Sequence, residues 1–178
     1  GQNLLLARRL VEARVRLVNV VAWTGLAPGE KFLSVETWDM HGNAGIDIFA
    51  NGWNGLGWAL PKCDEAVSAL PDDLSSRGLL DSTLVVFTSE FGRTPWSQNT
   101  TGRDHNAMGF STLLAGGGVK GGVIEGATDQ VGYHAVENPH YSRAPQSTIL
   151  QHVGPPHNTL TFVPTGRPPA LHAAGPGR

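Results

Sequence analysis

Two kinds of hydrophobic periodicity alternate between residues 3 and 115, and this alternation constrains the fold most. Helical spacing of apolar residues appears first in residues 3–13 and again in residues 60–74. Bounded, β-branched runs follow each of them, in residues 15–21 and 83–89, and a weaker run covers residues 111–115. Helices between buried strands predict an α/β layered fold with a mostly parallel sheet flanked by helices.

The second helical pattern contains residues that typically begin, bend or end a helix. Leu60, Cys63 and Leu74 belong to one apolar face. Pro61 fits the first turn of such a helix, whereas Pro71 falls inside it and is expected to kink or split it. Gly78 is a natural end for the helix. A further short helix is expected over residues 148–153.

The last third of the chain has a different composition. Residues 130–178 contain eight of the 12 prolines and five of the seven histidines. Residues 164–178 show no periodicity and several helix breakers, which predicts an irregular tail. We therefore expect one α/β domain over residues 1–163 with a loop-rich C-terminal third.

Composition excludes several classes of protein. The net charge is −2, which gives no global field for nucleic acid or for an anionic membrane surface. The single cysteine, Cys63, excludes an internal disulfide framework and a Cys-rich zinc site. No apolar run approaches the roughly 18 residues of a membrane span. Residues 1–11 mix leucines with two arginines, which is neither a signal peptide nor an anchor.

Polar clusters occupy the positions where chemistry sits in such folds, just beyond the carboxyl ends of strands. The first follows residues 15–21 in the chain, the second ends the strand over residues 83–89, and the third precedes residues 111–115. Between them they offer carboxylates and imidazoles, which are ligands of divalent metals. The clusters read Trp38-Asp-Met-His-Gly-Asn43, Ser89-Glu-Phe-Gly-Arg-Thr-Pro95 and Gly102-Arg-Asp-His-Asn106.

Each cluster also has a plain structural interpretation. Asp39 can cap a turn with His41 in solvent, and Glu90 can cap a helix or pair with Arg93. The dipeptide formed by Asp104 and His105 is common on protein surfaces. The combination favours a site because all three clusters lie in loops on one expected face. The other histidines lack ligand spacing and are expected to be solvated or bonded to the backbone: His134, His140, His152, His157 and His172.

Other motifs do not lead to a function. The glycine-rich run around Lys120 lacks the Ser or Thr and the helix that a phosphate-binding loop requires, so a close-packed turn is the better interpretation. No G-x-S-x-G elbow is present. Five tryptophans flank the polar loops, and core packing is the first interpretation for them, with a carbohydrate-stacking surface as the alternative: Trp23, Trp38, Trp53, Trp58 and Trp96.

Several segments together resemble a large bacterial family, abundant in planctomycetes, that is grouped with the alkaline phosphatase and sulfatase superfamily. The resemblance covers about residues 2–167. Its most specific blocks are Glu90-Phe-Gly-Arg-Thr-Pro95 and Gly102-Arg-Asp-His105, and it also includes Gln2 to Glu12, Trp38-Asp-Met-His-Gly-Asn43, Arg77-Gly-Leu-Leu-Asp81 and Leu114 to Gly122.

The resemblance implies part of an alkaline-phosphatase-like sandwich that hydrolyses phosphate or sulfate esters of small molecules or glycans. By that analogy Asp39 and His41 serve one metal, Glu90 stands where an Asp-His pair ends a strand, and His105 matches a later histidine ligand. Zinc is the expected metal, with calcium, magnesium and manganese as alternatives. Two arginines would pair with the anionic group: Arg93 and Arg103.

Departures from the family pattern leave a second class open. Family members are longer, and their N-terminal part, which resembles the superfamily's nucleophile region, has no counterpart here. The family's Asp-Leu-His is replaced by Ala144-Pro145-Gln146. We therefore expect weak hydrolysis by the isolated chain. The alternative is a non-catalytic remnant that binds a metal, a glycan or a protein. The expected partner is a second copy of the chain or a missing N-terminal segment supplied by another molecule. The resemblance also implies a bacterial, exported location.

Overall fold

The structure is a computed structural model that describes residues 1–22, 38, 40–41, 56–98, 101–141 and 143–154. Within these residues the fold is mixed α/β, with three helices and three small antiparallel sheets. The chain divides into two compact units, Gly1–Glu137 and Asn138–Arg178. The elements are α1 (Gln2–Glu12), α2 (Leu56–Ser76), η1 (Leu80–Ser82), β1 (Leu84–Phe87), β2 (Gly92–Arg93), β3 (His105–Asn106), β4 (Leu113–Gly116), β5 (Ala127–Thr128), β6 (Ala135–Glu137) and α3 (Arg143–Val153).

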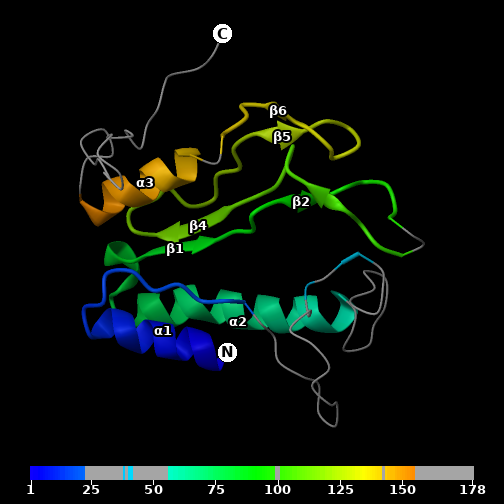
Figure 1. Cartoon of the computed structure of the whole chain (residues 1–178). Helices are drawn as coiled ribbons and strands as arrows, with labels where there is room; N and C mark the ends of the chain where they lie inside the picture. The colour runs from blue at the N-terminus through cyan, green and yellow to red at the C-terminus, as the bar shows by residue number, and fades with distance from the viewer. Residues whose placement is uncertain (23–37, 39, 42–55, 99–100, 142, 155–178) are drawn as a thin grey trace, which may run out of the picture. The chain divides into compact units, whose positions relative to one another are not determined.

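Both predicted helices of the first unit are present. α1 coincides with the first apolar periodicity, and α2 covers the second; they lie side by side in Figure 1. Small and apolar side chains form the buried core of the described residues: Ala7, Ala59, Cys63 and Leu74. Burial and the neighbouring Asp64 carboxylate raise the pKa of the Cys63 thiol.

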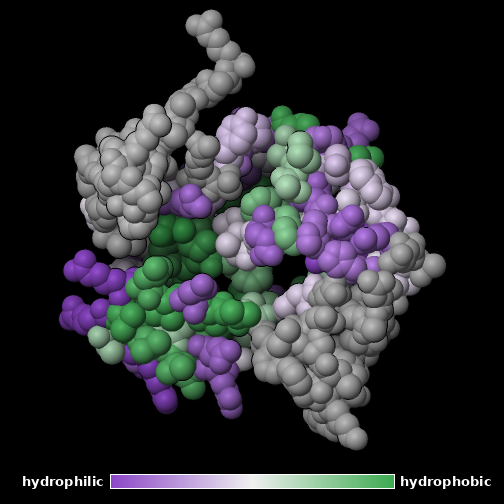
Figure 2. Space-filling model, viewed as in Figure 1, coloured by the Kyte–Doolittle hydropathy of each residue, from purple (hydrophilic) through white to green (hydrophobic). Residues whose placement is uncertain are grey.

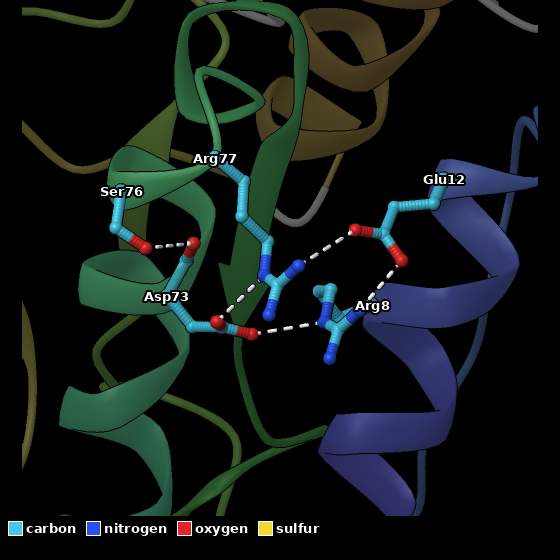
Figure 3. A network of polar contacts seen from close by, with 5 residues as sticks. All are labelled: Arg8, Glu12, Asp73, Ser76 and Arg77. Atoms are coloured by element: carbon cyan, nitrogen blue, oxygen red, sulfur yellow. Dashed lines mark hydrogen bonds and ion pairs between the residues drawn. The ribbon is translucent and has the colours of Figure 1, made fainter.

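A network of ion pairs joins α1 to α2 (Figure 3). The buried Arg8 guanidinium donates to Asp73 at 2.9 Å and to Glu12 at 2.5 Å. Arg77 completes the network, donating to the same two carboxylates at 2.8 and 3.2 Å. Exposed ion pairs stabilise little, but a buried guanidinium that loses its carboxylate is costly. Asp73 therefore fixes the register of the two helices.

α2 runs through both of its prolines without a break. It begins at Leu56, four residues before the expected start, so Pro61 lies beyond the first turn. The expectation that Pro71 can split the helix is wrong, whereas a kink there stays a prediction. Packing of Cys63 and Leu74 on either side outweighs one lost backbone hydrogen bond. Gly78 ends the helix as predicted, with a φ of +65°.

Residues 15–21 are not a strand, although their sequence predicts one. α1 closes with Arg14 at a φ of +67°, and the chain then continues without ladder partners among the described residues. Leu17 and Val21 are 75% and 78% exposed, so the segment is not buried either. β propensity expresses fit to a neighbouring strand, and the described residues supply none beside this segment.

The second and third predicted strands are β1 and β4, and they pair with each other. Leu84 lies opposite Gly116 and Phe87 opposite Leu113, in antiparallel register. β1 is half-buried to exposed rather than buried. A Cβ at Gly116 would lie 2.3 Å from the carbonyl oxygen of Thr83, and its φ is +72°, so the glycine-rich run is a close-packed turn. Parallel pairing is not observed in the described residues.

The second unit contains α3, which starts five residues before the expected helix and includes Ala144, Pro145 and Gln146. The predicted domain end at residue 163 and the predicted tail at 164–178 lie outside the described residues. Over the part of the chain that is described, the helices are too short or too polar to cross a membrane.

Asp73→Asn is expected to lower the free energy of unfolding at neutral pH, because it removes one of the two carboxylates that pair with the buried Arg8 and leaves Glu12 as the other. The hydrogen bond from Arg77 lowers the pKa of Asp73 in the folded state. Its contribution is therefore present above the ordinary pKa of about 3.9 and is lost as the pH falls through the lower folded value. Urea denaturation between pH 7 and pH 3 measures this.

The matched control is Asp72→Asn, one residue earlier on the same helix, where the side chain is exposed. It should change the free energy of unfolding little at any pH. A difference between wild type and Asp73→Asn that stays constant down to pH 3 would contradict the role given to the carboxylate.

Candidate functional site

Backbone pairing joins the second and third polar clusters. The chain leaves β1 at Phe87 and enters β2, which pairs with β3 in antiparallel register. Arg93 lies opposite His105, and Gly92 lies opposite Asn106. The prediction that these clusters share one region is confirmed for the described residues.

The first cluster is held against the third. The Arg103 N–H donates to the Met40 carbonyl at 2.7 Å, which brings the following His41 to the start of β3. The ring centroids of His41 and His105 lie 4.7 Å apart. Asp39 lies outside the described residues. Two imidazoles separated by 64 positions in the sequence therefore meet.

Asp104 also belongs to the site, although the ligand set implied by the family resemblance does not include it. Its Oδ1 lies 3.8 Å from the Nε2 of His41 and accepts the backbone N–H of His105 at 2.7 Å. The side chain is 54% exposed, so it is open to solvent. Its position directly before His105 was the available signal, but the contact with His41 depends on the fold.

Aromatic stacking orients His105. The Phe91 ring stacks on the imidazole with centroids 3.8 Å apart and an interplanar angle of 21°. The Arg93 guanidinium lies over the Phe91 ring, with its Cζ 5.5 Å from the ring centroid. Arg93 also donates to the Arg103 carbonyl at 3.0 Å, which holds both arginines in the site.

Glu90 takes no part in this gathering. Its side chain is exposed in the link between β1 and β2. Searched over the described residues, which leave out Asp39, no group of three or more His, Cys, Asp and Glu side chains has the geometry to hold a metal ion. Metal ligation by Asp39, His41, Glu90 and His105 stays a prediction.

Asn106 anchors β3 to the loops that follow it in the chain. It is 2% exposed, its amide donates to the Tyr133 carbonyl at 2.9 Å, and its Oδ1 accepts the Met108 N–H at 3.0 Å. Gly92 opposite it must be glycine, because a Cβ there would lie 2.1 Å from the Gly109 carbonyl oxygen. Gly92, the glycine of the Glu-Phe-Gly-Arg block, thus permits close packing of the Gly109 backbone against β2.

Thr94 links the two strands of the site and is buried. Its hydroxyl donates to the Trp96 carbonyl at 3.0 Å and accepts the Asp104 N–H at 3.1 Å. Because the side chain is buried and its proton is donated to a backbone carbonyl rather than to a general base, Thr94 is not placed to act as a nucleophile.

The chain belongs to the family described as "Protein of unknown function (DUF1501)", which it matches over residues 1–176. No curated protein and no solved structure matches it.

Asn106→Ala is expected to lower the free energy of unfolding by about 1–3 kcal/mol, since it removes two part-buried hydrogen bonds and leaves a cavity at a side chain that is 2% exposed. Thermal and urea denaturation measure this, and the ring resonances of His105 should shift as well. Asn19→Ala, at an exposed asparagine, is the control and should be near neutral. Equal stability of the two variants would contradict the anchoring role.

Proposed function

We propose that this chain is a metal-dependent hydrolase of phosphate or sulfate esters that is weak when isolated. The observation that carries the proposal is the meeting of His41, His105 and Asp104 beside two arginines. Imidazole and carboxylate are ligand types of zinc, and guanidinium groups match the oxygens of phosphate and sulfate. We also propose a more specific fold, a partial alkaline-phosphatase-like sandwich with a parallel sheet. The mixed α/β content and the family resemblance support it.

The donor set tests whether a metal suits the site. His41 and His105 supply two imidazoles at short range, which is part of a zinc site. The remaining ligands proposed are Asp39, two residues before His41, and Glu90; Asp104 is an additional carboxylate beside His41. A bound divalent ion would supply Lewis-acid polarisation of an ester oxygen.

The residues of the chain have separate tasks in this proposal. Arg93 and Arg103 bind and orient the anionic ester group through their forked N–H donors. Phe91 keeps the His105 ring in place by stacking. Ser89, in the link between β1 and β2, also bears a hydroxyl; it is exposed and does not stand where the superfamily has its nucleophile. We propose no activated nucleophile among the described residues of the site, so that hydrolysis relies on water, and the proposed activity is therefore weak.

His41→Ala combined with His105→Ala is expected to abolish stoichiometric zinc binding, because the double variant removes both imidazoles. Zinc per chain is measured by elemental analysis after dialysis and by calorimetric titration. His152→Ala is the matched control, since its ring bonds the Thr148 carbonyl of its own helix, and it should keep the zinc. Undiminished zinc in the double variant would refute the metal site.

Turnover of an activated aryl phosphate or sulfate by the zinc-loaded protein is expected to fall well below the common enzyme range of about 1–10³ s⁻¹. Wild-type turnover within that range, lost in both His41→Ala and Glu90→Ala, would contradict the weak activity while supporting the metal site.

A non-catalytic role in protein binding is the second candidate, and the exposed apolar side of α1 favours it. Leu6 is 57% exposed, with Leu5 and Leu10 also exposed, and Figure 2 shows apolar side chains gathered over this part of the molecule. Exposed apolar patches mark interaction sites. We propose a second copy of the chain as the partner.

Leu6→Glu is expected to shift the protein toward the monomer in light scattering coupled to gel filtration, because a carboxylate would be buried at the contact. Asn3→Glu adds the same charge at an exposed polar position of α1 and should leave the mass unchanged. A monomeric wild type at all concentrations would contradict self-association.

A further inference from the structure

An aromatic pair follows the site in the chain, with Trp96 exposed and Tyr133 half-buried. The rings of Trp96 and Tyr133 lie 4.6 Å apart between centroids, at an angle of 43°. Trp96 is nevertheless 54% exposed, so Tyr133 supports the indole while much of the ring faces solvent. Core packing, the first interpretation of the tryptophans, is wrong for Trp96. A large aromatic ring held open to water is suited to binding another ring.

Hydrogen bonds fix the backbone at both residues of the pair. The Thr94 hydroxyl donates to the Trp96 carbonyl, and the Asn106 amide donates to the Tyr133 carbonyl. The Asp129 carboxylate accepts the backbone N–H of Tyr133 at 2.8 Å, and this bond lowers the pKa of Asp129. A platform fixed in this way loses little conformational entropy when a ligand binds.

The same hydrogen bonds connect the platform to the site. The Thr94 hydroxyl that holds Trp96 also accepts the N–H of Asp104, whose carboxylate lies beside His41. Asn106, which holds Tyr133, follows His105 in β3. The backbone at the platform is therefore bonded to β3 and to the residue after β2, the strands that carry His105 and Arg93.

We propose that Trp96 and Tyr133 bind the pyranose ring of a sugar phosphate or sulfate, with its ester group toward His41 and His105. The apolar C–H face of a pyranose packs on an open indole, while its hydroxyls stay hydrated at the edge of the platform. Nucleobases, by contrast, are recognised by stacking together with hydrogen bonds along their edges, and the chain lacks the basic character of nucleic-acid binders. The placement of the ester group rests on the proposed function; the ring contact does not.

Saturation-transfer NMR and calorimetry test this with glucose 6-sulfate, glucose 6-phosphate and the uncharged methyl glucoside, each with and without zinc. Ethyl sulfate and glycerol 3-phosphate are the acyclic comparators. Trp96→Ala should raise the dissociation constant of the pyranose esters about tenfold, corresponding to about 1.4 kcal/mol, and leave the acyclic anions unchanged. Trp96→Phe should restore part of the affinity, and Ile124→Ala, at a highly exposed apolar residue of the same unit, should change nothing.

Equal pyranose binding by wild type and Trp96→Ala, or no saturation transfer to any pyranose, would overturn the proposal. Trp96-dependent binding of phenyl sulfate or adenosine monophosphate without binding of pyranoses would overturn it as well. Trp96-dependent binding of methyl glucoside with no gain from the ester group would support the platform and count against the proposed hydrolase. The two proposals therefore fail by different results.

Discussion

The short pairing of β2 with β3 is the constraint on which the site depends. It sets Arg93 opposite His105 and Gly92 opposite Asn106, although each strand contains two residues. Two rungs of a ladder do not stabilise themselves in water. The buried Asn106 side chain bonds β3 to the backbone of a following loop, and the lack of a Cβ at Gly92 lets the Gly109 backbone pack against β2. These contacts stabilise the pairing.

The helices could be predicted from sequence because their signals are local. The spacing of apolar residues in α1 and α2 lies within short stretches of sequence, and so does the glycine at position 78, which adopts a positive φ. Strand pairing is not local, and there the prediction failed in part. Residues 15–21 have the composition of a buried strand but lack a partner among the described residues, and β1 pairs with β4 in antiparallel rather than parallel register. Pro71 shows the same limit, since tertiary packing outweighs its helix-breaking tendency.

The candidate site was predictable as a region and not in its details. The motif positions of His41, His105, Arg93 and Arg103 indicated one face, and these four residues do meet, whereas Glu90 stays apart. The approach of Asp104 to His41 and the stacking of Phe91 on His105 follow from tertiary contacts that no spacing encodes. Likewise, 37 positions separate Trp96 from Tyr133, and only the fold joins them.

We propose that His41 and His105 bind one divalent metal together. X-ray absorption at the zinc edge of the zinc-loaded chain tests this, because scattering from imidazole rings is distinct from that of water or carboxylate. We expect at least two imidazole nitrogens at about 2.0–2.1 Å from zinc. A shell of oxygens alone, or a sulfur at about 2.3 Å from Cys63, would contradict it.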